Sequence, residues 1–158
     1  MAQSMPTTAE LLGTRQRILV TGGAGFIGGA VVRRLLRESD AVVFNLDKMG
    51  YASDLTSIEE VIKELGVQHQ QRHQLQAIDL CDADAVEKAV QQANPDLVMH
   101  LAAESHVDRS ISGPGVFIES NVTGTYNLLQ AVRSHFEQLT PERREQFRLH
   151  HISTDEVF

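Results

Sequence analysis

The chain has 158 residues, of which 42% are hydrophobic and 22% are charged, and this composition is typical of a soluble globular domain with its own core. Its net charge of −7 argues against a nucleic-acid partner, because binding phosphate backbones requires a basic face. No apolar run approaches the roughly 20 residues that span a bilayer, so no membrane segment is expected.

Residues 1–14 come first in the chain and lack the basic start and apolar stretch of a secretory signal. We expect them to form a flexible N-terminal extension. The single cysteine, Cys81, has no partner for an internal disulfide, as is usual in a reducing compartment. A cytoplasmic location is the default expectation.

From residue 17 onward, short apolar runs alternate with helical spacings. Strands are expected at 17–22, 41–47, 74–80, 96–103 and 147–153. Helices are expected within 24–39, 58–65, 82–93 and 122–136, with a turn at 111–115. This order predicts an α/β fold, a Rossmann-type doubly wound parallel sheet with strand order 3-2-1-4-5. One domain is expected over 15–158. In the helix expected within 24–39, Ile27, Val31 and Leu35 lie four residues apart and form one apolar face.

The segment TGGAGFIG at 21–28 joins the first strand to the first helix. Gly22 permits a tight turn, Gly25 lets backbone N–H groups approach a pyrophosphate, and Gly28 lets the helix pack close to the strand. The helix N-terminus then offers free N–H groups and a positive dipole end. This pattern predicts a dinucleotide site.

An acid at the end of the second strand indicates which dinucleotide binds. Asp47 follows Gly28 by 19 residues, close to the spacing of about 20 for the acid that binds the adenine ribose. Such an acid repels a 2′-phosphate and favours NAD over NADP, although the neighbouring Lys48 could tolerate that phosphate. Asp79 and Leu80, at the end of the third strand, are candidates for holding the adenine.

Four segments together resemble a known family. TGGAGFIG, LAAESHVDRS at 101–110, NVTGT at 121–125 and ISTDEV at 152–157 are similar to the extended short-chain dehydrogenase/reductase family, and within it to the dTDP-glucose 4,6-dehydratases. The resemblance covers residues 17–158. It implies an NAD-dependent lyase of deoxysugar biosynthesis that acts on the nucleotide sugar dTDP-glucose, and a homodimer in the full-length form.

The resemblance also implies roles for particular residues. Phe26 and Ile27 would lie against the pyrophosphate, and Glu104 would support the loop that contacts cofactor and sugar. The other implied cofactor contacts are Asp47, Lys48, Met49, Gly50, Asp79, Leu80, Leu101, Ala102, Ala103, Ser105 and Ser120. Substrate contacts would come from Glu104, Ser105 and Thr154.

The implied reaction requires two carboxyl groups in different protonation states. Hydride leaves C4 of the glucose, a base removes the C5 proton, an acid assists the loss of water from C6, and the hydride returns to C6. By the resemblance, Asp155 is the general acid and Glu156 the general base, and Thr154 binds the 4-hydroxyl. No histidine shows metal-ligand spacing, so no metal is expected.

Several positions depart from the family pattern. Gly29, Ser53-Asp54 and Phe158 stand where Ser, Gly-Asn and Tyr are usual. The family's Tyr-x-x-x-Lys pair and its C-terminal sugar-nucleotide domain are not found in these 158 residues. We therefore expect this chain alone to be inactive in dehydration, and its fifth strand to expose an edge that promotes association.

Two alternatives remain open. One is a related enzyme, a UDP-sugar 4,6-dehydratase, an epimerase or a decarboxylase. Asp155-Glu156 disfavours the epimerase and the decarboxylase, which need no elimination pair, but UDP and dTDP are not distinguished. The other alternative is a non-catalytic NAD-binding module, which the missing Tyr-x-x-x-Lys pair supports.

Overall fold

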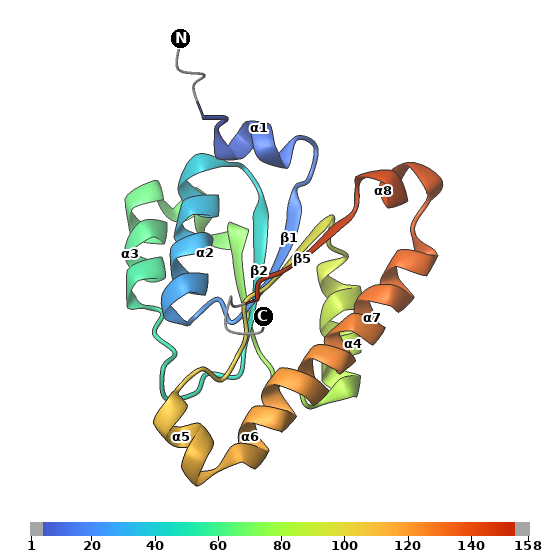
Figure 1. Cartoon of the computed structure of the whole chain (residues 1–158). Helices are drawn as coiled ribbons and strands as arrows, with labels where there is room; N and C mark the ends of the chain where they lie inside the picture. Colours follow the sequence, from blue (N-terminus) through green and yellow to red (C-terminus); the bar gives the residue numbers. More distant parts are fainter. Residues whose placement is uncertain (1–4, 154–158) are drawn as a thin grey trace.

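The computed structural model describes residues 5–153, except for the side chains of residues 107–109. A single sheet runs through the molecule between two layers of helices (Figure 1). Its strands are β1 (Arg17–Thr21), β2 (Val42–Asp47), β3 (His73–Ala77), β4 (Leu97–His100) and β5 (Arg148–His151). All pairings are parallel, and the strand order β3-β2-β1-β4-β5 confirms the predicted doubly wound sheet.

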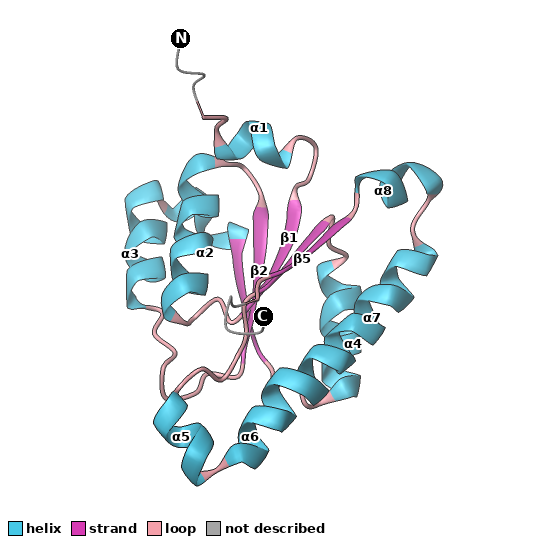
Figure 2. Cartoon of the chain, in the orientation of Figure 1, coloured by secondary structure: helices cyan, strands magenta, loops and turns pink. Residues whose placement is uncertain are grey.

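Helices α2 (Phe26–Glu38) and α3 (Thr56–Leu65) cover one face of the sheet, and α4 (Ala83–Ala93) and α7 (Thr125–Gln138) cover the other (Figure 2). The shorter helices are α1 (Thr8–Leu12), α5 (Val107–Ser112), α6 (Pro114–Ile118), α8 (Pro141–Gln146), the 3-10 helix η1 (Val67–Arg72) and the π-helix η2 (Glu119–Gly124).

Alternation along the strands divides the core between the two faces. In β1, Ile18 and Val20 pack with the α2–α3 layer, whereas Leu19 packs with the α4–α7 layer. These side chains are fully buried. Burial on both faces explains why the central strands β1 and β2 read as nearly continuous apolar runs in the sequence.

Residues 8–12 differ from the expected flexible extension, because they form helix α1. Thr7 and Glu10 make a capping box at its N-terminus, and Leu12 is buried in the core beside α2. Reciprocal capping of this kind stabilises even a short helix. Ordered structure therefore begins within the segment that we expected to be a lead-in.

The buried face of α2 is rotated from the expected one. Val32, Leu35 and Leu36 are buried, while Ile27 is 63% exposed. Gly28 and Gly29 lie on the buried side of the first turn. Ile27 lies outside the core and lines the cavity at the carboxyl ends of the strands.

The segment expected as a turn at 111–115 contains the junction of two helices. α5 ends at Ser112, α6 begins at Pro114, and Gly113, whose backbone is neither helical nor extended, separates them. Proline at the first helical position suits this start, since its missing N–H would have no partner there. α6, η2 and α7 then follow one another without a break.

Candidate functional site

One cavity of about 440 Å³ lies at the carboxyl ends of the strands. Gly22, Lys48, Ile78 and Leu101 each directly follow a strand and line it. The chain order of the strands reverses between β1 and β4, and ligands of open α/β sheets bind at such a switch point.

Most of the predicted cofactor residues meet around this cavity. Within residues 5–153 the predicted lining residues are Gly22, Gly25, Phe26, Ile27, Gly28, Asp47, Lys48, Gly50, Asp79, Leu80, Leu101, Ala102, Ala103, Glu104, Ser105 and Ser120. Met49 does not line it; its backbone is turned, with φ at 56°, and its N–H is bonded to Asp47. That these residues bind NAD stays a prediction.

The glycine loop is packed too tightly for side chains. Gly22 has a φ of 70°, and a Cβ there would lie 2.7 Å from the Cα of Ala102. A Cβ on Gly28 would lie 2.1 Å from the carbonyl oxygen of Gly22. Gly25 caps α2 without a side-chain hydrogen bond, and the first turn holds no acid. The helix N-terminus is thus open toward the cavity, in the arrangement that binds phosphate.

Asp47 connects the glycine loop to the segment after β2. Its Oδ2 accepts the N–H of Ala24 at 3.0 Å, and its Oδ1 accepts the N–H of Met49 at 2.8 Å and the hydroxyl of Ser53 at 2.7 Å. The residue is 7% exposed. A carboxylate offers about four lone-pair sites, so acceptor capacity remains on Oδ2 for one ligand hydroxyl.

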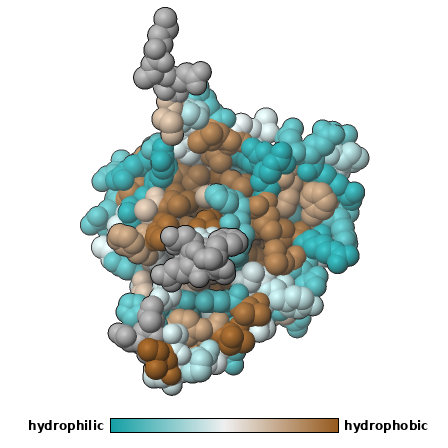
Figure 3. All heavy atoms as spheres, viewed as in Figure 1, coloured by the Kyte–Doolittle hydropathy of each residue, from teal (hydrophilic) through white to brown (hydrophobic). Residues whose placement is uncertain are grey.

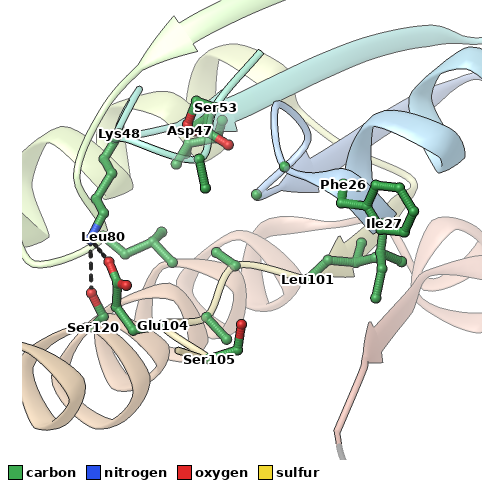
Figure 4. Close-up of a pocket in the computed structure, with 18 of the residues that line it drawn as sticks. Phe26, Ile27, Asp47, Lys48, Ser53, Leu80, Leu101, Glu104, Ser105 and Ser120 are labelled. Carbon is green, nitrogen blue, oxygen red and sulfur yellow. Dashed lines mark hydrogen bonds and ion pairs between the residues drawn. The ribbon is translucent and has the colours of Figure 1, made fainter. Parts of the chain in front are cut away.

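Across the cavity from Phe26 and Ile27, a charged bridge joins three segments (Figure 4). The ammonium of Lys48 lies 2.5 Å from Oε1 of Glu104 and 3.3 Å from the hydroxyl of Ser120. Burial by itself would lower the pKa of Lys48, but the hydrogen bond and charge of Glu104, with further help from Asp79, raise it. The lysine is therefore firmly cationic.

A chain of hydrogen bonds supports the loop after β4. The ring of His100 bonds Thr21 through Nδ1 at 2.6 Å and Thr125 through Nε2 at 3.0 Å, and the Thr21 hydroxyl accepts the N–H of Ala102 at 3.3 Å. Burial, followed by the charge of His151, lowers the pKa of His100 to about 4. A neutral imidazole thus ties β1, β4 and α7 beneath the cavity.

Three lining residues make contacts that the sequence did not predict. The rings of Tyr51 and His106 meet edge to face with centroids 6.0 Å apart, although they come from different loops. Ser53 supplies the hydroxyl that Asp47 accepts, at a position where the resemblance leads one to expect glycine. That departure from the family pattern was the available signal for Ser53. Nothing in the spacing of Tyr51 and His106 indicated their contact.

The predicted catalytic residues Thr154, Asp155 and Glu156 lie outside the described residues. Over residues 5–153, no group of three His, Cys, Asp or Glu side chains is arranged to hold a metal ion. In the same part of the chain, no helix is long and apolar enough to cross a membrane.

A comparison with family models matches residues 19–158 to GDP-mannose 4,6 dehydratase. Among curated proteins, the chain is 50% identical over 143 residues to dTDP-glucose 4,6-dehydratase of Neisseria meningitidis serogroup B. That match covers 90% of this chain and 39% of the relative. The chain thus spans about two fifths of the length of the curated relatives that it matches.

Solved structures show the same likeness. DesIV of Streptomyces venezuelae, a dTDP-glucose 4,6-dehydratase solved with NAD bound, matches with a TM-score of 0.65 and 38% identity, over 76% of this chain and 36% of that one. UDP-glucose 4-epimerase of Thermus thermophilus, in complex with NAD, matches with a TM-score of 0.60 and 33% identity, over 76% and 34%.

Proposed function

The chain belongs to the GDP-mannose 4,6 dehydratase family, and from this premise we propose that it forms the NAD-binding part of a dTDP-glucose 4,6-dehydratase. The observation that carries the proposal is the glycine cradle. Gly22 and Gly28 leave no room for a Cβ, and the open N-terminus of α2 faces the cavity. This arrangement fits a pyrophosphate.

Different residues of the cavity would bind different parts of NAD. The first-turn N–H groups of α2 would hold the pyrophosphate, and Asp47 would accept a ribose hydroxyl through its remaining lone pair. Asp79 and Leu80 would hold the adenine, while the loop from Leu101 to Ser105 would run beneath the cofactor. When bound, NAD supplies a hydride acceptor and later returns the hydride to the sugar.

The chemical step is assigned to the segment after β5. Thr154 would bind the sugar 4-hydroxyl, Asp155 would protonate the departing C6 oxygen, and Glu156 would remove the C5 proton. Support comes from the position of β5, which lies beside β4 and brings its carboxyl end to the same edge of the sheet as the cavity. The substrate would be dTDP-glucose, after which the curated relatives are named.

A second candidate is a related NAD-dependent nucleotide-sugar enzyme, such as a 4-epimerase. The likeness to UDP-glucose 4-epimerase favours it. The sequence Asp155-Glu156 favours the dehydratase, because epimerisation needs no elimination pair. The domain boundaries of 15–158, a cytoplasmic location and a homodimer belong to the same proposal.

Calorimetric titration of the chain with NAD and NADP tests the cofactor assignment. We expect NAD to bind more tightly, and Asp47→Asn to reduce the preference. Equal affinities for NAD and NADP in the unaltered chain would contradict the role of Asp47. A separate incubation with NAD and dTDP-glucose, analysed for a 4-keto-6-deoxy product, tests the expectation that these 158 residues do not complete the reaction.

A further inference from the structure

Lys48 is the cation that could change the cofactor preference of this site. In dinucleotide sites of this architecture, the acid at the end of the second strand binds the adenine ribose, and a nearby cation can accept a 2′-phosphate. Lys48 directly follows Asp47 and lines the same cavity. Whether the site admits NADP therefore depends on what the Lys48 ammonium already binds.

That ammonium is engaged inside the protein. It lies 2.5 Å from Oε1 of Glu104 and 3.3 Å from the Ser120 hydroxyl (Figure 4). The Glu104 side chain is only 12% exposed, so solvent screens this ion pair less than it would screen a pair on the open surface. The charge of Lys48 is largely balanced before any ligand enters.

The position of Glu104 is itself fixed from the other side. The side-chain oxygen of Asn121 accepts the Glu104 N–H at 2.8 Å, and its side-chain nitrogen donates to the Glu104 carbonyl oxygen at 2.9 Å. A backbone held in both directions cannot easily follow the lysine if Lys48 turns toward a ligand. The carboxylate of Glu104 thus reaches Lys48 from a backbone that is anchored in place.

We propose that Glu104 is a specificity-determining residue of this site: by holding the Lys48 ammonium in an ion pair, it withholds that charge from a 2′-phosphate and so favours NAD over NADP. The inference rests on the proposed NAD site and adds to it a second acid besides Asp47. Asp47 would repel the phosphate directly, whereas Glu104 would act by occupying the cation that could compensate.

The test measures the affinity of the full 158-residue chain for NAD and NADP by calorimetry in four variants. Glu104→Gln keeps the shape of the side chain and removes its charge. We expect the affinity for NADP to rise about fivefold to tenfold relative to NAD, a size typical of a partly buried ion pair. Glu145→Gln, an exposed acid in α8, changes the net charge equally and should leave the ratio unchanged.

Lys48→Met tests the same inference from the other side of the ion pair, by removing its cation. Alone it should lower the affinity for NADP relative to NAD, because it leaves the Glu104 carboxylate without its counter-charge; combined with Glu104→Gln it removes both charges and should return the ratio to that of the unaltered chain. An unchanged NADP-to-NAD ratio in Glu104→Gln, or an equal loss of both nucleotides, would overturn the inference while leaving the NAD site intact. A ratio in the double variant clearly below that of the unaltered chain would also overturn it, because Lys48 would then already be serving the phosphate, and this comparison stands even if Glu104→Gln alone failed to fold. Failure of the unaltered chain to bind NAD would reject the proposed cofactor site and this inference with it.

Discussion

At the scale of single residues, a local constraint shapes the glycine loop. Gly22, Gly25 and Gly28 follow a strand and precede a helix, and the tight turn needs glycine wherever the chain folds in this way. Both the loop and Asp47 could therefore be predicted from the sequence, since the spacing of Asp47 from the loop is set by one helix and one strand.

The partners of these residues were not predictable. Glu104 and Ser120 lie 56 and 72 residues from Lys48 along the chain. No local pattern indicates which acid reaches a given lysine across a cavity. The contact of Ser53 with Asp47 is short in sequence but depends on the turn at Met49, whose positive φ no residue pattern indicated.

Gly28→Ala tests the cradle directly. A Cβ at this position would lie 2.1 Å from the backbone oxygen of Gly22, so either the loop or the helix must shift. We expect a loss of roughly 1–3 kcal/mol in the free energy of unfolding, as in other overpacked sites, and at least tenfold weaker binding of NAD, which is about 1.4 kcal/mol. Urea unfolding and calorimetry measure the two effects.

Gly115→Ala is the matched control. No heavy atom lies within 4 Å of a Cβ there, and alanine in place of glycine within a helix stabilises it by up to about 1 kcal/mol. If Gly28→Ala proved as stable as Gly115→Ala and bound NAD as well as the unaltered chain, the close packing of the glycine loop would have no role in binding.

At the scale of helices and strands, the order and the parallel pairing followed from the alternation of apolar patterns. The buried faces of helices α2 and α7 did not follow from these patterns. The spacing of Val122, Tyr126, Leu129, Val132 and Phe136 suggested one apolar face in the last long helix. In the structure the buried residues of α7 are Leu128, Ala131, Val132 and His135. Two apolar stripes on one helix cannot be ranked without knowing what packs against each.

Three residues of the motif NVTGT, at the junction of η2 and α7, each make a different contact. Asn121 clamps the backbone of Glu104, and Thr125 bonds the ring of His100. A Cβ on Gly124 would lie 2.9 Å from the Cβ of Leu80, so glycine lets this turn of helix approach the segment that follows β3. Asn121, Gly124 and Thr125 thus each have a separate physical reason for their place.

His100 gives this part of the fold a measurable dependence on pH. Its pKa is lowered to about 4, first by burial and then by His151, whereas an unperturbed histidine has a pKa of about 6.5. Between these values the unfolded chain binds a proton that the folded chain does not. Stability contributed by neutral His100 is therefore complete above a pH of about 6.5 and is lost as the pH falls toward about 4, by up to roughly 3 kcal/mol.

We expect His100→Gln to unfold more easily at neutral pH but to lose less stability than the unaltered chain as the pH falls from about 6.5 to about 4. His150→Gln removes an exposed histidine of the same strand pair and should keep the full pH dependence. Urea unfolding across this range measures both variants. Parallel pH profiles for the two would show that His100 is not the group that titrates.

At the scale of the whole molecule, an exposed apolar stripe along α6, η2 and α7 is a candidate surface for association with a second chain. Ile118, Val122, Tyr126 and Leu129 recur at spacings of three and four along α6, η2 and α7 and are 43–59% exposed. Figure 3 shows further apolar side chains at the surface over α5 and α6. An exposed apolar stripe along one helix is typical of a surface that packs against another helix.

The proposed homodimer would use this stripe, with α7 packing against its counterpart in a second copy, as a two-fold interface requires self-complementary surfaces. Val122→Asp would place a charge at the centre of the stripe. Because the burial of one such side chain contributes about 1.5 kcal/mol or more, we expect the dimer to dissociate at least tenfold more readily. Sedimentation velocity over a range of protein concentrations measures this.

Gln138→Asp, an exposed position at the end of the same helix, is the control and should leave association unchanged. The outcome also separates two routes to association. Within residues 5–153, β5 pairs only with β4 and so forms an edge of the sheet, which offers unpaired backbone groups to another chain. Association through that edge would persist in Val122→Asp, whereas association through the helices would not. A dimer that survives Val122→Asp unchanged would therefore assign the contact to the sheet edge and remove the helix stripe from the proposal.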